Sequence, residues 1–282
     1  MRLALCNEVL AGLALERQCE IAAALGYDGL EIAPFTLDEA PHRLEPAEVG
    51  RVRRVIESFG LVVTGLHWLL VAPPGLSVTD PDPRTRARTL EVVTALVRLC
   101  AELGGRVLVH GSPKQRAIAP GETHAVARAR LVEFLAAAGD AAQANGVVYC
   151  IEPLGRAETA LVNTVAEAAE IVREVDRPSL RTMIDCSAAA ATESQTLPEL
   201  IDTWLPTGLI AHVQVNDPNR RAPGQGELRF APVFAALRRH GYDATVSVEP
   251  FDYVPDGVGA AAFAAGYLRG VRESIAPDPT SD

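Results

Sequence analysis

Short apolar runs alternate with stretches of helical periodicity along almost the whole chain. In the first unit, the apolar run Leu3–Cys6 precedes Leu15–Leu25, where apolar residues recur at helical spacing until Gly26. The same order repeats to the end of the chain. The predicted strands are Leu3–Cys6, Gly29–Ile32, Leu61–Leu70, Arg106–His110, Val147–Ile151, Leu180–Ile184, Leu209–Val215 and Ala244–Val248. The predicted helices are Leu15–Leu25, Glu45–Phe59, Arg84–Leu103, Gly121–Ala144, 164–175, Pro198–Trp204, Pro232–Arg239 and Gly257–Ser274.

Eight strands, each followed by a helix, predict an α/β fold of the (β/α)8 TIM barrel type. A doubly wound open sheet is the alternative, and it is disfavoured because no Gly-rich dinucleotide fingerprint follows the first strand. No composition break marks a linker. We therefore expect a single barrel domain over residues 1–275 and a disordered tail over 276–282.

Polar side chains gather at the carboxyl ends of the predicted strands. The run Val147–Ile151 ends in Glu152, and Pro153 then stops the strand. In a barrel all such ends face one pocket. The candidates for this pocket are His67, Trp68, His110, Lys114, Glu152, Asp185, His212, Gln214 and Glu249.

Three of these candidates, Glu152, Asp185 and Glu249, are carboxylates that would repel one another in a partly buried pocket. A divalent cation is the simplest compensation, and oxygen ligands favour Mg²⁺ or Mn²⁺. The amide oxygen of Gln214 is a candidate fourth ligand. His212 shares the face of Gln214 on the same strand, so it is a second candidate for ligating or orienting.

Several loop residues lack an obvious structural role. Arg156 and Glu158 follow Glu152 in one loop, and Arg220 and Arg221 lie in the loop after the seventh strand. Arginines in this position are suited to substrate hydroxyls, carboxylates or phosphates, or to solvated ion pairs. Lys114 is the only lysine among 26 basic residues, which makes it a further candidate.

Composition limits the classes of partner. The net charge of −10 argues against a nucleic-acid surface and favours a small-molecule partner. The five cysteines show no paired spacing, so we expect reduced core residues and neither disulfides nor a zinc site. No uninterrupted apolar segment is long enough to span a membrane, which predicts a soluble cytoplasmic protein without a membrane partner.

Together these motifs resemble the xylose isomerase-like barrel superfamily, the sugar phosphate isomerase/epimerase group, and within it the D-tagatose and D-psicose 3-epimerases. The Glu-Pro-Leu-x-Arg-x-Glu segment is matched from Glu152 to Glu158, and the helix opening Asn-Thr by Asn163 and Thr164. The Asn-Arg-Arg-x-Pro-Gly-x-Gly loop is matched from Asn219 to Gly226. The resemblance covers nearly the whole chain and is densest from Cys150 to Glu249.

The resemblance implies an isomerase or epimerase of carbohydrate metabolism that acts on a keto-sugar, keto-cyclitol or related polyol. Glu152 and Glu249 would be its acid/base pair and would transfer protons on opposite faces of a cis-enediolate. The implied metal is Mn²⁺, Mg²⁺ or Co²⁺, with Glu152, Asp185, Gln214 and Glu249 as its ligands. The resemblance implies that Glu158 and Arg220 hold substrate oxygens. The positions at strand ends add the substrate-binding candidates His67, Trp68, His110, Lys114 and His212.

Two positions depart from the family pattern, because Gln214 and Ala188 stand where the family has histidines. A glutamine at this position also resembles some metal-dependent 3-dehydroshikimate dehydratases. A dehydratase is therefore the alternative, with Lys114 or His67 as proton donor, and a catalytically inactive barrel with a binding role is the third hypothesis. Either a homodimer or a homotetramer is compatible with these expectations.

Overall fold

The computed structural model describes residues 1–276, and over them eight parallel strands close into a barrel in the order β1 to β8. The strands are β1 (Arg2–Cys6), β2 (Gly29–Ile32), β3 (Val62–Leu66), β4 (Val107–His110), β5 (Val148–Ile151), β6 (Leu180–Asp185), β7 (Ile210–Val215) and β8 (Thr245–Val248). Each strand pairs in parallel with the next, and β1 pairs with β8 to close the ring. The (β/α)8 prediction is confirmed.

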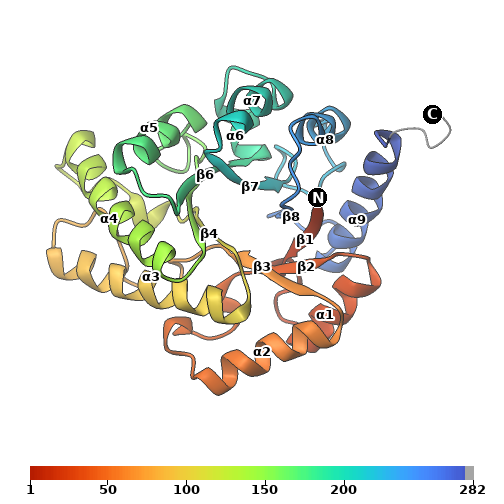
Figure 1. Ribbon diagram of the computed structural model, residues 1–282, viewed down its shortest axis with the longest axis horizontal. Coiled ribbons are helices and arrows are strands. Elements are labelled where there is room, and N and C mark those ends of the chain that lie inside the picture. The colour runs from red at the N-terminus through yellow and green to blue at the C-terminus, as the bar shows by residue number, and fades with distance from the viewer. Residues whose placement is uncertain (277–282) are drawn as a thin grey trace.

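Helices surround this ring on all sides (Figure 1). They are α1 (Leu15–Ala24), α2 (Pro46–Ser58), α3 (Pro83–Leu103), α4 (His124–Ala144), α5 (Val165–Val175), α6 (Cys186–Thr192), α7 (Leu197–Trp204), α8 (Phe230–Arg239) and α9 (Gly257–Ser274). Short polar side chains fix several starts. Thr164 accepts a hydrogen bond from the backbone of Glu167 at the start of α5, and Thr196 forms a capping box with Glu199 at α7.

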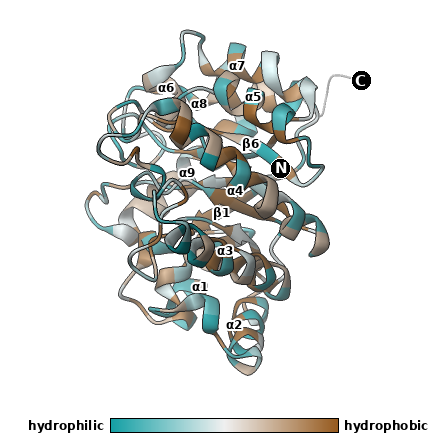
Figure 2. Cartoon of the chain, turned by 90° about the vertical axis from the view of Figure 1, so that its left-hand side faces the viewer, coloured by the Kyte–Doolittle hydropathy of each residue, from teal (hydrophilic) through white to brown (hydrophobic). Residues whose placement is uncertain are grey.

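The main apolar core lies between the barrel and its helices. Nearly every strand residue is buried, as expected for parallel strands that are covered on both faces. Figure 2 shows the hydrophobic segments running through the barrel strands, with hydrophilic segments on outer elements such as α2. The barrel interior also contains the polar side chains Glu31, His212, Gln214 and Ser247, which contact one another and are fully or almost fully buried.

The structure differs from the predicted elements mainly at their ends. The run Leu61–Leu70 was expected to be one strand, but β3 ends at Leu66 and Trp68 adopts a left-handed conformation with φ of 52°. The helix predicted from Gly121 begins at His124, after the N-cap Thr123. The helix α6 was not predicted at all; Asp185, the last residue of β6, is its N-cap.

The structure also describes the cysteines and the apolar content of the helices. All five cysteines are buried and free. Within residues 1–276, no helix is long and apolar enough to cross a membrane. The tail predicted over 276–282 lies, apart from Ala276, outside the described residues.

Candidate active site

Three carboxylates from different strand ends meet at the carboxyl-terminal mouth of the barrel. Glu152 follows β5, Asp185 ends β6 and Glu249 follows β8, and the three residues are only 6%, 4% and 4% exposed. One carboxylate oxygen from each lies within 4.8 Å of the others. We call these three residues the mouth cluster.

Burial raises the pKa of every member of the mouth cluster. It raises the pKa of Glu152 well above its usual value, and the nearby charges of Glu249 and Asp185 raise it further. Burial raises the pKa of Asp185 to about 6, although hydrogen bonds from Ala188 and Asn216 oppose the shift. Burial likewise raises the pKa of Glu249 to about 8, although the contact with His67 opposes the shift. The three carboxyl groups therefore retain protons to higher pH than ordinary carboxyl groups, and their ionised forms are not fully compensated by the protein.

A divalent cation fits these residues. Carboxylate oxygens are the preferred ligands of hard divalent ions, and a cation between them would remove the repulsion that raises their pKa values. Asp185 is already oriented for this. Its Oδ1 accepts from the backbone N–H of Ala188 at 2.7 Å, and its Oδ2 accepts from Nδ2 of Asn216 at 2.8 Å.

Asn216 ties three strand ends together and was not singled out from the sequence. Besides Asp185, its amide contacts the carbonyl of Glu249 at 3.1 Å and accepts from the backbone of Ser187 at 2.9 Å. The available signal was its place directly after β7, where the other strands carry their carboxylates. Asn216 thus fixes the spacing of Asp185 and the backbone of Glu249.

Among residues 1–276, the ring nitrogens that contact the carboxylate of Glu249 lie against one of its oxygens only. His67 Nδ1 lies 2.9 Å from its Oε1, and Trp68 Nε1 donates to the same atom at 3.0 Å. On the other side of its ring, His67 Nε2 lies 2.9 Å from Oε2 of Glu8. The sequence indicated Glu8 only as an interruption of the first apolar run.

The position of the Glu152 carboxylate depends on the absence of a side chain at Gly111, whose backbone lies close to it. A Cβ atom at Gly111 would overlap Oε2 of Glu152, so only glycine leaves room for the carboxylate in this position. Arg116 lies behind it, fully buried, and its charge opposes the rise in the pKa of Glu152. The guanidinium nitrogens of Arg116 have no hydrogen-bond partner among the described residues, and burial lowers the pKa of Arg116 to about 10.

Gln214 lies beside Asp185 in the β6–β7 register, but its amide nitrogen contacts Oε1 of Glu31 at 3.2 Å. Its Oε1 is buried and has no partner within residues 1–276. His212 Nε2 lies 2.8 Å from Oε2 of Glu31, and Ser247 donates to that carboxylate as well. We call Glu31, His212, Gln214 and Ser247 the interior cluster. It lies one layer below the mouth cluster, because Ser247 precedes Glu249 by two residues on one strand face.

The remaining sequence candidates lie at the rim or outside the barrel wall. Glu158 and Arg220 form an ion pair at the rim, with 3.8 Å between Oε1 and Nη1. The guanidinium carbon of Arg220 lies 4.6 Å from the centre of the Phe251 ring. Lys114 is exposed in the short 3-10 helix Lys114–Arg116. His110 points away from the pocket, since its Nδ1 lies 2.9 Å from the hydroxyl of Tyr149 and its ring packs on Phe134 of α4.

A cavity of about 40 Å³ opens above the mouth cluster. Glu152 and Glu249 line it together with the rim residues His67, Trp68, Val109, Gly111, Pro113, Leu154, Glu158, Arg220 and Phe251. This volume holds no more than a few water molecules, so a sugar would have to displace rim side chains.

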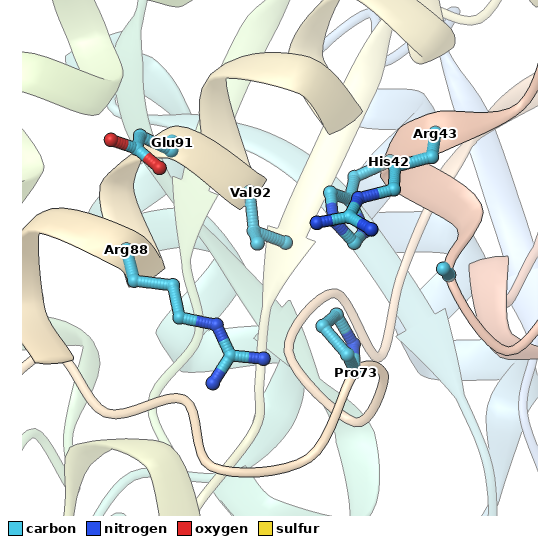
Figure 3. A pocket seen from close by; sticks show the side chains of 7 residues that line it. His42, Arg43, Pro73, Arg88, Glu91 and Val92 are labelled. Atoms are coloured by element: carbon cyan, nitrogen blue, oxygen red, sulfur yellow. The ribbon is translucent and has the colours of Figure 1, made fainter.

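Larger hollows lie elsewhere but contain no carboxylate cluster. One of about 640 Å³ lies at the amino-terminal ends of the strands. Another, of about 290 Å³, lies between α3 and the segments around His42 and Pro73 (Figure 3). There, Arg88 and Arg43 extend from opposite sides, and Glu91 points away from Val92 at the centre. We place the candidate site at the small cavity because its surface is concave and includes Glu152 and Glu249, two members of the mouth cluster.

Comparison with known proteins gives a consistent result. Residues 19–271 match the model of the family described as xylose isomerase-like TIM barrel. A D-psicose 3-epimerase of Ruminiclostridium cellulolyticum is 28% identical over 250 residues, which cover 86% of this chain and 80% of the relative. An L-ribulose 3-epimerase of Mesorhizobium japonicum is 25% identical over 245 residues, covering 84% and 75%.

Solved structures share the same fold. A D-psicose 3-epimerase crystallised in the presence of D-fructose superposes with a TM-score of 0.80 at 22% identity, covering 96% of this chain and 99% of that one. A 3-keto-D-glucoside 4-epimerase from E. coli superposes with a TM-score of 0.81 at 22% identity and the same coverage. The resemblance expected from the sequence motifs is confirmed.

Proposed function

Because the chain belongs to the xylose isomerase-like TIM barrel family, we propose that it is a divalent-metal-dependent epimerase or isomerase of keto-sugars, with Glu152 and Glu249 as its acid and base. One observation carries the proposal. Three buried carboxylates from separate strand ends converge within 4.8 Å at the mouth of the barrel, where their charges repel one another. Relatives named as ketose 3-epimerases make a ketose the first substrate class to test.

The metal-binding part of the proposal assigns Glu152, Asp185 and Glu249 as ligands, with Gln214 as the fourth. For Gln214 the support is its register beside Asp185 and its buried, unpartnered Oε1 among the described residues. When bound, Mn²⁺, Mg²⁺ or Co²⁺ would supply positive charge that stabilises a substrate oxyanion.

The proton transfers are assigned to residues on opposite sides of the mouth. Glu152 follows β5 and Glu249 follows β8, so the two carboxylates approach a substrate from different directions. One takes the proton from the carbon beside the carbonyl, and the C–H electron pair becomes the double bond of an enediolate. The other carboxyl group returns a proton to the opposite face, which inverts that carbon. The raised pKa values of both groups suit proton exchange near neutral pH.

The rim residues are assigned to substrate binding. Glu158 and Arg220 pair across the opening, so both can exchange that exposed contact for substrate hydroxyls. Ala188 leaves the wall near Asp185 short and apolar, which favours a ketose without a charged group at that position.

The test is solvent deuterium exchange with D-psicose and D-fructose in the presence of Mn²⁺. We expect deuterium at the carbon beside the carbonyl and formation of the C3 epimer, and we expect both to stop when the metal is chelated. An unsaturated product absorbing in the ultraviolet would instead identify a dehydratase. Absence of exchange with these ketoses and with L-ribulose, together with no thermal stabilisation by Mn²⁺, would overturn the proposal and leave a binding role.

A further inference from the structure

Two neighbouring side chains of the β3–α3 loop converge on one oxygen of Glu249. His67 Nδ1 and Trp68 Nε1 lie 2.9 Å and 3.0 Å from Oε1. Successive residues of an extended chain point to opposite sides, so such convergence is not available to a regular strand. Here β3 has ended at Leu66, and the left-handed backbone of Trp68 turns both side chains to the same acceptor.

The other oxygen of Glu249 is left for the pocket. Within residues 1–276, Oε2 receives no hydrogen bond from the protein. Since Oε1 already has two N–H groups directed at it, rotation of the carboxylate would break both contacts. The two donors therefore distinguish the oxygens of Glu249 and select the one that faces a ligand.

A second carboxylate holds His67 from behind. The ring of His67 is fully buried, and its Nε2 lies 2.9 Å from Oε2 of Glu8. Glu8 is itself buried, and neither its carboxylate oxygens nor His67 Nε2 makes a hydrogen bond among the described residues, so the contact between them is a close electrostatic one. It favours the ring orientation in which Nδ1 is directed at Glu249.

We propose that His67 and Trp68 are positioning residues for Glu249: they hold its Oε1, so that Oε2 is the oxygen presented to the pocket, and the nearby carboxylate of Glu8 favours this orientation of the His67 ring. The inference rests on the proposed function for the role of Glu249. It assigns His67 and Trp68 to the carboxylate rather than to the substrate.

A two-base epimerase makes this role measurable. Each C3 epimer is deprotonated by the carboxylate on its own face, so a fault in Glu249 slows deuterium exchange from one epimer and spares exchange from the other. General destabilisation of the protein would slow both equally. A change in the ratio of the two exchange rates therefore reports on one carboxylate of the pair, and a change in the same direction as in Glu249→Gln identifies Glu249.

Trp68→Phe removes the indole N–H and keeps an aromatic ring beside Phe251. In the wild type the ring centroids of Trp68 and Phe251 are 6.2 Å apart, in an edge-to-face arrangement. We expect kcat to fall about 10-fold, as for loss of one hydrogen bond to a charged group, with KM nearly unchanged. Exchange from only one of D-psicose and D-fructose should slow. The matched control is Trp204→Phe, the other tryptophan, which lies at the end of α7 and should leave both rates unchanged.

His67→Asn tests the second donor while retaining an amide near the position of Nδ1. It should preserve part of the contact with Glu249, lose the contact with Glu8, and slow the same epimer as Trp68→Phe. Equal slowing of both epimers by these two variants, or no slowing by either, would overturn the inference.

A measurement without substrate separates this inference from the proposed function. The chain has two tryptophans, so ¹H–¹⁵N spectra of the metal-free protein contain two indole resonances, which Trp204→Phe assigns. The Trp68 resonance should move in Glu249→Gln and the Trp204 resonance should not. An unmoved Trp68 resonance contradicts the positioning role even in an active enzyme. An inactive wild type whose Trp68 resonance moves contradicts the proposed function alone.

Metal stoichiometry provides a last check. Cys6, Glu8, His67 and Glu249 also lie close enough together to be considered as metal ligands. Titration with Mn²⁺ should give one bound ion per chain, and Glu8→Gln should leave that number unchanged. A second ion that disappears in Glu8→Gln would make this group a metal site and overturn the positioning role.

Discussion

The mouth cluster and the interior cluster contain equally buried glutamates whose electrostatics are opposite. Burial alone would raise the pKa of Glu31, but the charge and hydrogen bond of His212 lower it to about 2. In the mouth cluster, burial and neighbouring carboxylates raise the pKa of Glu152, and no cation within residues 1–276 forms an ion pair with it. The two clusters lie in adjacent layers of the barrel, since Ser247 and Glu249 are two residues apart.

This difference lies in how fully the partners of each carboxylate offset its burial. Glu31 has an imidazole, a hydroxyl and an amide directed at it, and its pKa falls below the usual value. Glu249 and Asp185 also have donors, but these do not offset burial, and the pKa of each stays raised. The mouth cluster therefore favours a cation or a proton from outside, as the proposed function requires.

Replacing acids in the mouth cluster should have the largest effect on activity. We expect Glu152→Gln and Glu249→Gln each to lower turnover by at least ~10²-fold, because each removes one proton-transfer group. The stability of the metal-free protein should stay level or rise, since a like charge is removed. Steady-state kinetics and thermal unfolding measure both quantities, and a near-normal rate in either variant would refute its assigned role.

The same substitution in the interior cluster should act on stability. Glu31→Gln leaves the buried His212 ring without its carboxylate partner, and we expect a loss of about 1–3 kcal/mol in the free energy of unfolding, measured by urea denaturation. Adding His212→Gln should recover part of this loss. Glu20→Gln on the exposed face of α1 is the control and should change stability by less than about 0.5 kcal/mol. A loss at Glu31 no greater than this would mean that the cluster is not compensated as described.

A smaller effect should appear in the way the folding stability of the metal-free protein depends on pH. A folded carboxyl whose pKa is raised to about 8 binds more protons than its unfolded counterpart between pH 4.5 and 8, so stability falls as pH rises. The raised pKa of His67 acts in the same direction. The lowered pKa of His110, about 3, opposes this only below its unfolded value near 6.5. Glu31 contributes stability that is lost only as pH falls from about 4.5 towards 2.

Between pH 6.5 and 8 the mouth should therefore dominate. We expect the melting temperature of the chelated protein to rise as pH is lowered from 8 to 6.5. The rise should be smaller in Glu249→Gln and after addition of Mn²⁺. If the chelated wild type shows no dependence on pH in this window, or the opposite dependence, the carboxyls of the mouth are not titrating as their surroundings imply.

The sequence predicts the barrel because its signal is long and repeated. Eight apolar runs alternate with helical stretches, and each strand end is local in the chain, so the pattern itself places Glu152, Asp185 and Glu249 at one mouth. The contacts of individual side chains are not accessible in this way. The pairing of Gln214 and His212 with Glu31 joins β7 to β2 across the barrel, and no pattern along the chain encodes which interior residues meet.

Backbone conformation is a second limit. An apolar run through Leu70 gives no sign that Trp68 is left-handed, although this turn decides where His67 and Trp68 point. Other polar residues in or near the two clusters do have a signal in the sequence. Glu31 is an acid within a buried strand, and Asn7 and Glu8 directly follow β1, the position at which other strands carry their polar groups.

Gly111 ties the placement of Glu152 to a position that has no side chain of its own. Any other residue there would displace the carboxylate of Glu152 while leaving the fold intact, because the conflict is with the tip of that side chain alone. On the role proposed for Glu152, substitution of Gly111 would therefore be tolerated by the barrel and not by its chemistry.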